Sequence, residues 1–97
     1  MGQKYSGPML ELLEVDVHKR LVQAEAGGAE AQYDLGLLYA TGHGVDQNFI
    51  EAHKWFNLAA IHGIGRAAGD RCDVALELTA RDIAKALRLA RQWDTVH

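Results

Sequence analysis

The chain of 97 residues has one cysteine, one proline and no long apolar run. Because Cys72 cannot form a disulfide within the chain, disulfide-stapled small secreted folds are excluded. No segment approaches the roughly 20 apolar residues that a membrane-spanning helix requires. The N-terminus also lacks the apolar stretch of a secretory signal. The sequence therefore predicts one soluble, cytoplasmic domain without a membrane span.

The net charge is also small, at −3, which gives no indication of nucleic-acid binding. Its distribution is uneven, because residues 1–51 carry eight acids and three bases whereas residues 52–97 carry five acids and seven bases. The two halves therefore have net charges of −5 and +2. Head-to-tail contact between unlike ends of two copies is one hypothesis that this asymmetry permits.

Motifs of catalysis and of metal binding are missing from the chain. The sequence has no glycine-rich phosphate loop and no serine nucleophile elbow. Two metal ligands on one helix stand three or four residues apart, and no two histidines have that spacing. Surface or turn positions are therefore expected for His18, His43, His53, His62 and His97. The sequence predicts no enzyme, no catalytic residue, no cofactor and no metal site.

What the sequence does contain is a pattern of small and large apolar residues on both sides of a glycine turn. The apolar residues recur at helical spacing, which predicts two closely packed antiparallel helices. The first is expected over residues 29–41, and the second ends near residue 62. The residues of this packing motif are Ala31, Leu35, Gly36, Tyr39, Gly42, Gly44, Val45, Ala52, Trp55, Phe56, Ala59 and Ala60.

This motif resembles the Sel-like repeat, a branch of the tetratricopeptide superfamily. About ten positions of different chemistry agree over some thirty residues, so the resemblance is specific. It implies an all-α fold, a short superhelix or solenoid of antiparallel helical hairpins. It also implies a module that binds other proteins and has no catalytic activity.

The spacing continues beyond the first unit. Residues at positions 24, 27 and 31 recur in kind as Ala60, Gly63 and Ala67, which gives a period of 36 residues. The second unit lacks the glycine turn, and Thr79 with Asp82 offers a variant capping box at that place. A final helix that covers the end of the stack is expected after it.

The predicted organisation is a mobile head at residues 1–7 and a single helical domain at residues 8–94. Within it we expect a leading helix at 8–26, the first repeat at 27–62, and a degenerate second repeat with its capping helix at 63–94. Pro8 suits a first helical turn, and the glycines at 27 and 63 suit helix ends. The total is about five helices and no strand.

The resemblance places partner binding on the inner groove, which the first helix of each hairpin lines. Aligning the motif points to Glu30, Tyr33, Leu37 and Thr41, and the offset of 36 adds Arg66 and Asp73 from the second unit. Tyr33 and Leu37 would be the apolar anchors for a bound peptide if they are exposed. The alternative is that the leading helix covers them.

A second candidate surface is a row of four cations in the last predicted helix, Arg81, Lys85, Arg88 and Arg91. Their spacing places them along one face. This face is either a docking surface for an acidic partner or an ordinary solvated face.

The sequence favours a non-catalytic adaptor that binds a protein or peptide through the groove, as a monomer or weak homo-oligomer. The alternative function is self-assembly through the open ends of the stack.

Overall fold

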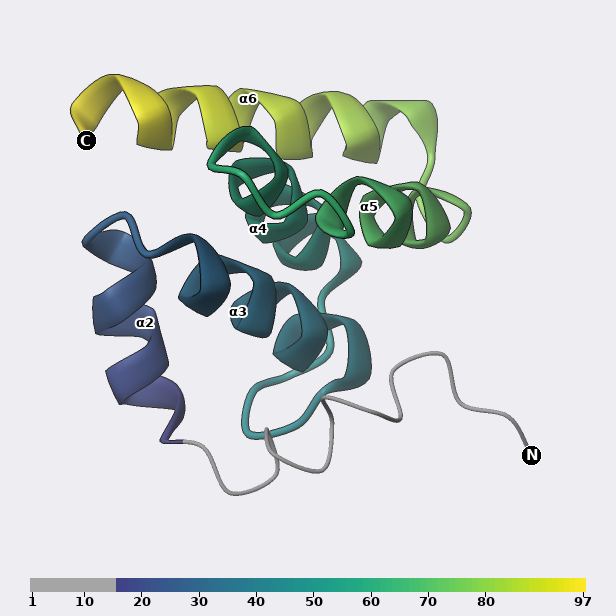
Figure 1. The fold of residues 1–97 in the computed structure, drawn as a ribbon. Helices are drawn as coiled ribbons and strands as arrows, with labels where there is room; N and C mark the ends of the chain where they lie inside the picture. The colour runs from purple at the N-terminus through teal and green to yellow at the C-terminus, as the bar shows by residue number, and fades with distance from the viewer. Residues whose placement is uncertain (1–15) are drawn as a thin grey trace.

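The computed structural model describes residues 16–97, and every regular element in that range is an α-helix. Figure 1 shows α6 lying across one side of the molecule, with α2 and α3 on the other side. The all-α prediction is confirmed. The helices are α2 (Val17–Glu25), α3 (Ala29–Thr41), α4 (Phe49–Ile61), α5 (Ala67–Ala75) and α6 (Ala80–Val96). None of these described helices has both the length and the apolar character needed to cross a membrane.

Helix α2 begins later than the expected leading helix. The Asp16 carboxylate accepts a hydrogen bond from the Lys19 backbone N–H at 3.3 Å, which caps α2 at its N-terminus. One continuous helix from residue 8 to 26 is therefore not present, because Asp16 has extended backbone geometry. The expected start at Pro8 and the head at residues 1–7 lie outside the described residues.

The later helix starts also depend on side-chain caps. Asn48 Oδ1 accepts from the Glu51 backbone N–H at 3.1 Å, which caps α4. At α6 the predicted capping box is present, since Thr79 accepts from the Asp82 N–H and the Asp82 carboxylate accepts from the Thr79 N–H. These short polar residues satisfy backbone donors that have no partner inside the helix.

The turn between α3 and α4 depends on glycine. Gly42 and Gly44 both have φ of 75°, a left-handed conformation that strains residues with a side chain. Gly44 also faces Val17 of α2, whose Cγ2 atom would lie 2.7 Å from an added Cβ. The Asn48 N–H donates to the Tyr39 carbonyl at 2.9 Å and closes the turn. The turn thus fixes the α3–α4 hairpin and supports α2.

Helix α4 lies at the centre of the fold, because α3, α5 and α6 all pack against it. Its Trp55, Phe56 and Leu58 side chains are fully or almost fully buried. On α3, Gly36 faces the ring of Phe56, and an added Cβ would lie only 2.4 Å from two ring carbons. The absence of a side chain at Gly36 therefore lets α3 approach α4 closely.

The second unit departs from a regular hairpin. Helices α5 and α6 make their main contacts with α4 and few with each other. The degenerate second repeat expected at residues 63–94 thus contains no closely packed helix pair. The reason lies in α5, which has 9 residues and buries only Ala67 and Val74. Two small side chains offer too little apolar surface to hold a long partner helix.

The C-terminal end of α6 is tied back to α2. The Trp93 Nε1–H donates to the Glu25 carboxylate at 2.9 Å, and His97 Nε2 lies 3.2 Å from the same carboxylate oxygen. The His97 ring stacks on Trp93 with centroids 4.0 Å apart, and Trp93 meets Trp55 edge to face. Helix α6 thereby covers the end of the stack, as a capping helix does.

The close approach at Gly36 can be tested by Gly36→Ala. Although alanine favours helix formation, the added methyl group overlaps the buried Phe56 ring, so we expect the free energy of unfolding to fall by about 1–3 kcal/mol. Gly69→Ala in α5 is the matched control, because an added Cβ there meets no atom within 4 Å. This control should gain about 0.5–1 kcal/mol. Urea denaturation measures both, and a stabilised Gly36→Ala protein would contradict the close approach.

Candidate functional site

Four polar side chains meet where the start of α5 lies beside α3. The Tyr33 hydroxyl donates to the Asp70 carboxylate at 2.5 Å, and Arg66 Nη2 donates to Glu30 Oε2 at 3.0 Å. The guanidinium of Arg66 lies over the Tyr33 ring, 4.4 Å from its centroid, in a cation–π contact. We call Glu30, Tyr33, Arg66 and Asp70 the inner-face cluster. It joins the first helix of the repeat to the first helix of the next unit.

The two halves of the inner-face cluster differ in exposure. Burial, followed by the hydrogen bond to Asp70 and the charge of Asp70, raises the pKa of Tyr33 to about 12, although Arg66 opposes this. The phenol therefore stays protonated near neutral pH and remains a donor to Asp70. By contrast, the Arg66 and Glu30 side chains are 59% and 64% exposed. A partly buried hydrogen bond thus supports an ion pair that faces water.

A shallow depression of about 630 Å³ adjoins Glu30 at the turn between α2 and α3. Its wall is mostly backbone and small side chains, with Arg20 on one side, and Arg20 forms an ion pair with Asp34 at 3.1 Å. Glu30 therefore belongs both to the inner-face cluster and to the rim of an open hollow. The lining residues are Arg20, Gln23, Ala26, Gly28, Ala29, Glu30 and Ala31.

Two of the six predicted groove residues are not exposed. Tyr33 is 5% exposed and Leu37 is 0% exposed, so neither side chain can receive a peptide directly. The expectation of two exposed anchors is therefore wrong. The physical reason is that α3 packs against both α2 and α4, so it has two covered faces rather than one.

The other predicted groove residues divide between the cluster and separate positions. Glu30 and Arg66 meet across the offset of 36 residues. Thr41 is half-buried, and its hydroxyl donates to the Leu37 carbonyl at 2.8 Å. Asp73 is half-buried on α5 and forms no hydrogen bond or ion pair with the cluster. Asp70, which the sequence analysis did not select, takes the place in the cluster that was expected for Asp73. An acidic residue one helical turn before Asp73 was the signal that could have identified it.

The residues of the packing motif lie mostly in the core. Its members on α3 and α4 are buried or half-buried, and Val45 packs against the core from the turn. Gly42 and Gly44 are exposed in the turn itself. These residues hold the helices together and leave the surface to other side chains.

One histidine is not on the surface. His53 is buried in α4, and burial followed by the positive charge of Arg71 lowers its pKa. The expectation of surface or turn positions for all five histidines is therefore wrong, because α4 has neighbours on three sides. Within residues 16–97, no three side chains of the His, Cys, Asp and Glu types converge as a metal site would require.

Comparison with known protein families identifies the repeat formed by α3 and α4. Residues 29–64 match the family model of the Sel1 repeat, which covers α3, the glycine turn and α4. Residues 29–64 of the chain therefore form a Sel1 repeat. No curated protein and no solved structure matches the chain. Sel1 repeats belong to the tetratricopeptide-like helical repeats and generally mediate protein–protein interaction without catalysis.

The Tyr33–Asp70 hydrogen bond can be tested by a double-mutant cycle. Tyr33→Phe removes a donor to a carboxylate, and we expect the free energy of unfolding to fall by about 1–2 kcal/mol. Asp70→Asn should cost a similar amount, and the double variant should cost less than the sum. Urea denaturation provides the values.

The matched control is Tyr39→Phe, since Tyr39 is also on α3, is half-buried, and its hydroxyl has no hydrogen-bond partner within residues 16–97. This variant should change the free energy of unfolding by less than about 0.5 kcal/mol. Equal effects of the two Tyr→Phe substitutions would show that the Asp70 contact contributes nothing.

Proposed function

We propose that this protein is a non-catalytic adaptor that holds a partner protein or peptide at the inner-face cluster and the adjoining depression. The observation that carries the proposal is the exposed Arg66–Glu30 ion pair on a buried support. Glu30 of this pair also lines a hollow large enough for several side chains. The partner thus meets both signs of charge at one place.

A carboxylate of the partner can take the place of Glu30 in this ion pair. An exposed pair at 3.0 Å contributes about 0–1 kcal/mol in water, so a partner carboxylate can replace Glu30 at Arg66 with little cost. Arg66 already lies over the Tyr33 ring, which restricts the guanidinium before binding. Less rotamer freedom is then lost on binding, and the planar group can donate two parallel hydrogen bonds to a carboxylate.

The support beneath the pair is rigid. Tyr33 is held by Asp70 on one side and packs against Phe56 on the other, with ring centroids 5.6 Å apart. Because Phe56 also packs against Gly36, the position of the binding surface depends on the packing of α3 on α4. A preformed surface favours affinity because little ordering accompanies binding.

Self-assembly is the second candidate function. Leu76 at the end of α5 and Val96 at the end of α6 are both strongly exposed apolar side chains. A second copy that covered these ends would remove them from water. In this case the partner recovered in a binding experiment would be the chain itself.

Site-specific crosslinking in the native cell tests the proposal. A photo-crosslinking benzoylphenylalanine at Gly69, one turn after Arg66, has space because no atom lies within 4 Å of an added Cβ. We expect it to capture a specific protein, and Arg66→Glu should reduce the yield by about tenfold because it opposes a partner carboxylate. The product is identified by mass spectrometry.

The matched control places the same crosslinker at Asp46, an exposed position in the α3–α4 turn. It should capture none of the partner. Equal yields from the two positions, or an undiminished yield in Arg66→Glu, would contradict an inner-face site. Capture of a second copy would support self-assembly instead.

A further inference from the structure

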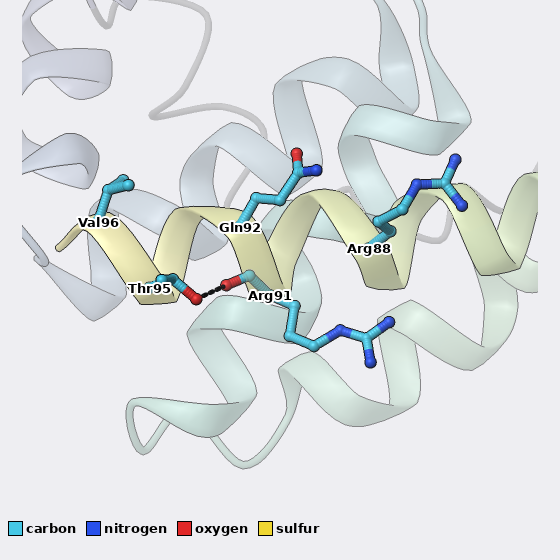
Figure 2. Close-up of a pocket in the computed structure, with 5 residues that line it drawn as sticks. All are labelled: Arg88, Arg91, Gln92, Thr95 and Val96. Atoms are coloured by element: carbon cyan, nitrogen blue, oxygen red, sulfur yellow. Dashed lines mark hydrogen bonds between the residues drawn. The ribbon is translucent and has the colours of Figure 1, made fainter.

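Helix α6 presents four cations that have no acidic partner among the described residues. Arg81, Lys85, Arg88 and Arg91 are all exposed, and none forms an ion pair within residues 16–97. Figure 2 shows the Arg88 side chain extending above α6 in the view and the Arg91 side chain extending below it. Mutual repulsion and the absence of a partner leave this row able to bind an anionic group.

Two depressions meet at Arg91. One, of about 330 Å³, lies on the outer face of α6 and is lined by Arg88, Arg91, Gln92, Thr95 and Val96 (Figure 2). The other, of about 300 Å³, lies in the seam between α4 and α6. Arg91 is the residue that these two linings share. A ligand could therefore contact the seam and the outer face at the same time.

The seam is apolar except at its edges. Ile61 of α4 is 59% exposed and Leu87 of α6 is 41% exposed, and both line it. Asn57, Arg91 and Asp94 supply its polar edges, and the Asp94 carboxylate lies 3.8 Å from His62 Nε2. Two aliphatic side chains beside unpaired arginines form a surface that is apolar in the middle and cationic on one side.

Residues 16–51 of a second copy, the acidic half as far as the structure describes it, offer little complementary charge. Most carboxylates of residues 16–51 already have partners within the chain, since Glu25, Glu30, Asp34 and Glu51 contact Trp93, Arg66, Arg20 and Lys54, respectively. Asp16 caps α2. The unpaired cations therefore favour a different acidic molecule.

Nucleic acid and membrane fit the surface less well than a peptide. Bases stack on exposed aromatic rings, whereas Trp93, the aromatic residue of α6, is buried and covered by His97. A helix that lies on a bilayer inserts its apolar face, whereas Ala86 and Ala90 of α6 are buried in the fold. The remaining apolar surface is small and fits individual side chains.

We propose that the α4–α6 seam, with the adjoining face of α6, is a second binding surface that takes an acidic amphipathic peptide of a partner protein. An aliphatic side chain of the peptide lies on Ile61 and Leu87, and its carboxylates contact Arg88 and Arg91. Asp94 repels carboxylates at its own edge, so the acids of the peptide face away from that edge. This surface shares no residue with the inner-face cluster.

Fluorescence anisotropy with a synthetic probe tests the proposal. The probe is a fluorescein-labelled helical peptide of about 18 glutamate and leucine residues, and its counterpart with glutamine in place of glutamate is the charge control. We expect the acidic probe to bind, and Arg88→Gln with Arg91→Gln to raise its Kd at least about tenfold. Ile61→Ser with Leu87→Ser should have a similar effect through the lost apolar contacts.

The matched control is Arg81→Gln with Lys85→Gln, which removes the same charge from the other end of α6. It should change the Kd less than about threefold, as expected for solvated charges outside the contact. Arg66→Glu should likewise retain probe binding, which separates this surface from the inner-face cluster. All the substituted side chains are exposed, and circular dichroism verifies that the variants fold.

Three outcomes would overturn the proposal. The first is no probe binding at protein concentrations up to about 1 mM. The second is an equal loss in the two charge-removal variants, which would indicate nonspecific attraction. The third is tighter binding to a single-stranded oligonucleotide or to phosphatidylserine vesicles than to the peptide, which would assign α6 to those ligands.

Discussion

The contact between Gly36 and the Phe56 ring sets how closely α3 and α4 lie, and the rest of the fold depends on that approach. Phe56, Trp55 and Leu58 are buried on α4, and each such side chain stabilises the folded state by roughly 1.5–3 kcal/mol relative to exposure. Helices α5 and α6 pack on the same α4. A displaced α4 would therefore carry both of them away from α3.

The geometry of both candidate sites depends on how α3, α5 and α6 pack against α4. The inner-face cluster needs α3 and the start of α5 at a fixed separation, because the Tyr33–Asp70 contact spans only 2.5 Å. The seam near Arg91 needs α6 to lie along α4, and the Trp93–Glu25 hydrogen bond helps to hold it there. The surface side chains determine what binds, and the packing residues determine where those side chains stand.

The sequence predicted the parts of the fold that local signals encode. The hairpin of α3 and α4 followed from the apolar spacing around Gly36 and from the glycine turn at 42–44. The capping box at Thr79 followed from two polar residues three positions apart. Such features are formed by residues close in the chain, so their spacing alone identifies them.

Features that depend on the number of neighbours of a helix were not predictable from spacing. Tyr33, Leu37 and His53 are buried because α3 has two covered faces and α4 has three neighbours. The spacing of apolar residues identifies one apolar face of a helix, and it does not show that a second face is also covered by a neighbouring helix. For the site, the repeat offset predicted that Glu30 and Arg66 correspond, whereas the Tyr33–Asp70 contact depends on the detailed placement of α5.

Native-state amide hydrogen exchange, followed by NMR, tests most directly the claim that the α3–α4 packing supports the rest of the structure. The slowest amides should lie in α3 and α4 around Gly36 and Phe56. Their opening free energy should equal the free energy of global unfolding, while α2, α5 and α6 open at lower free energy. Protection in α5 or α6 that matched or exceeded that of α3 and α4 would contradict the account.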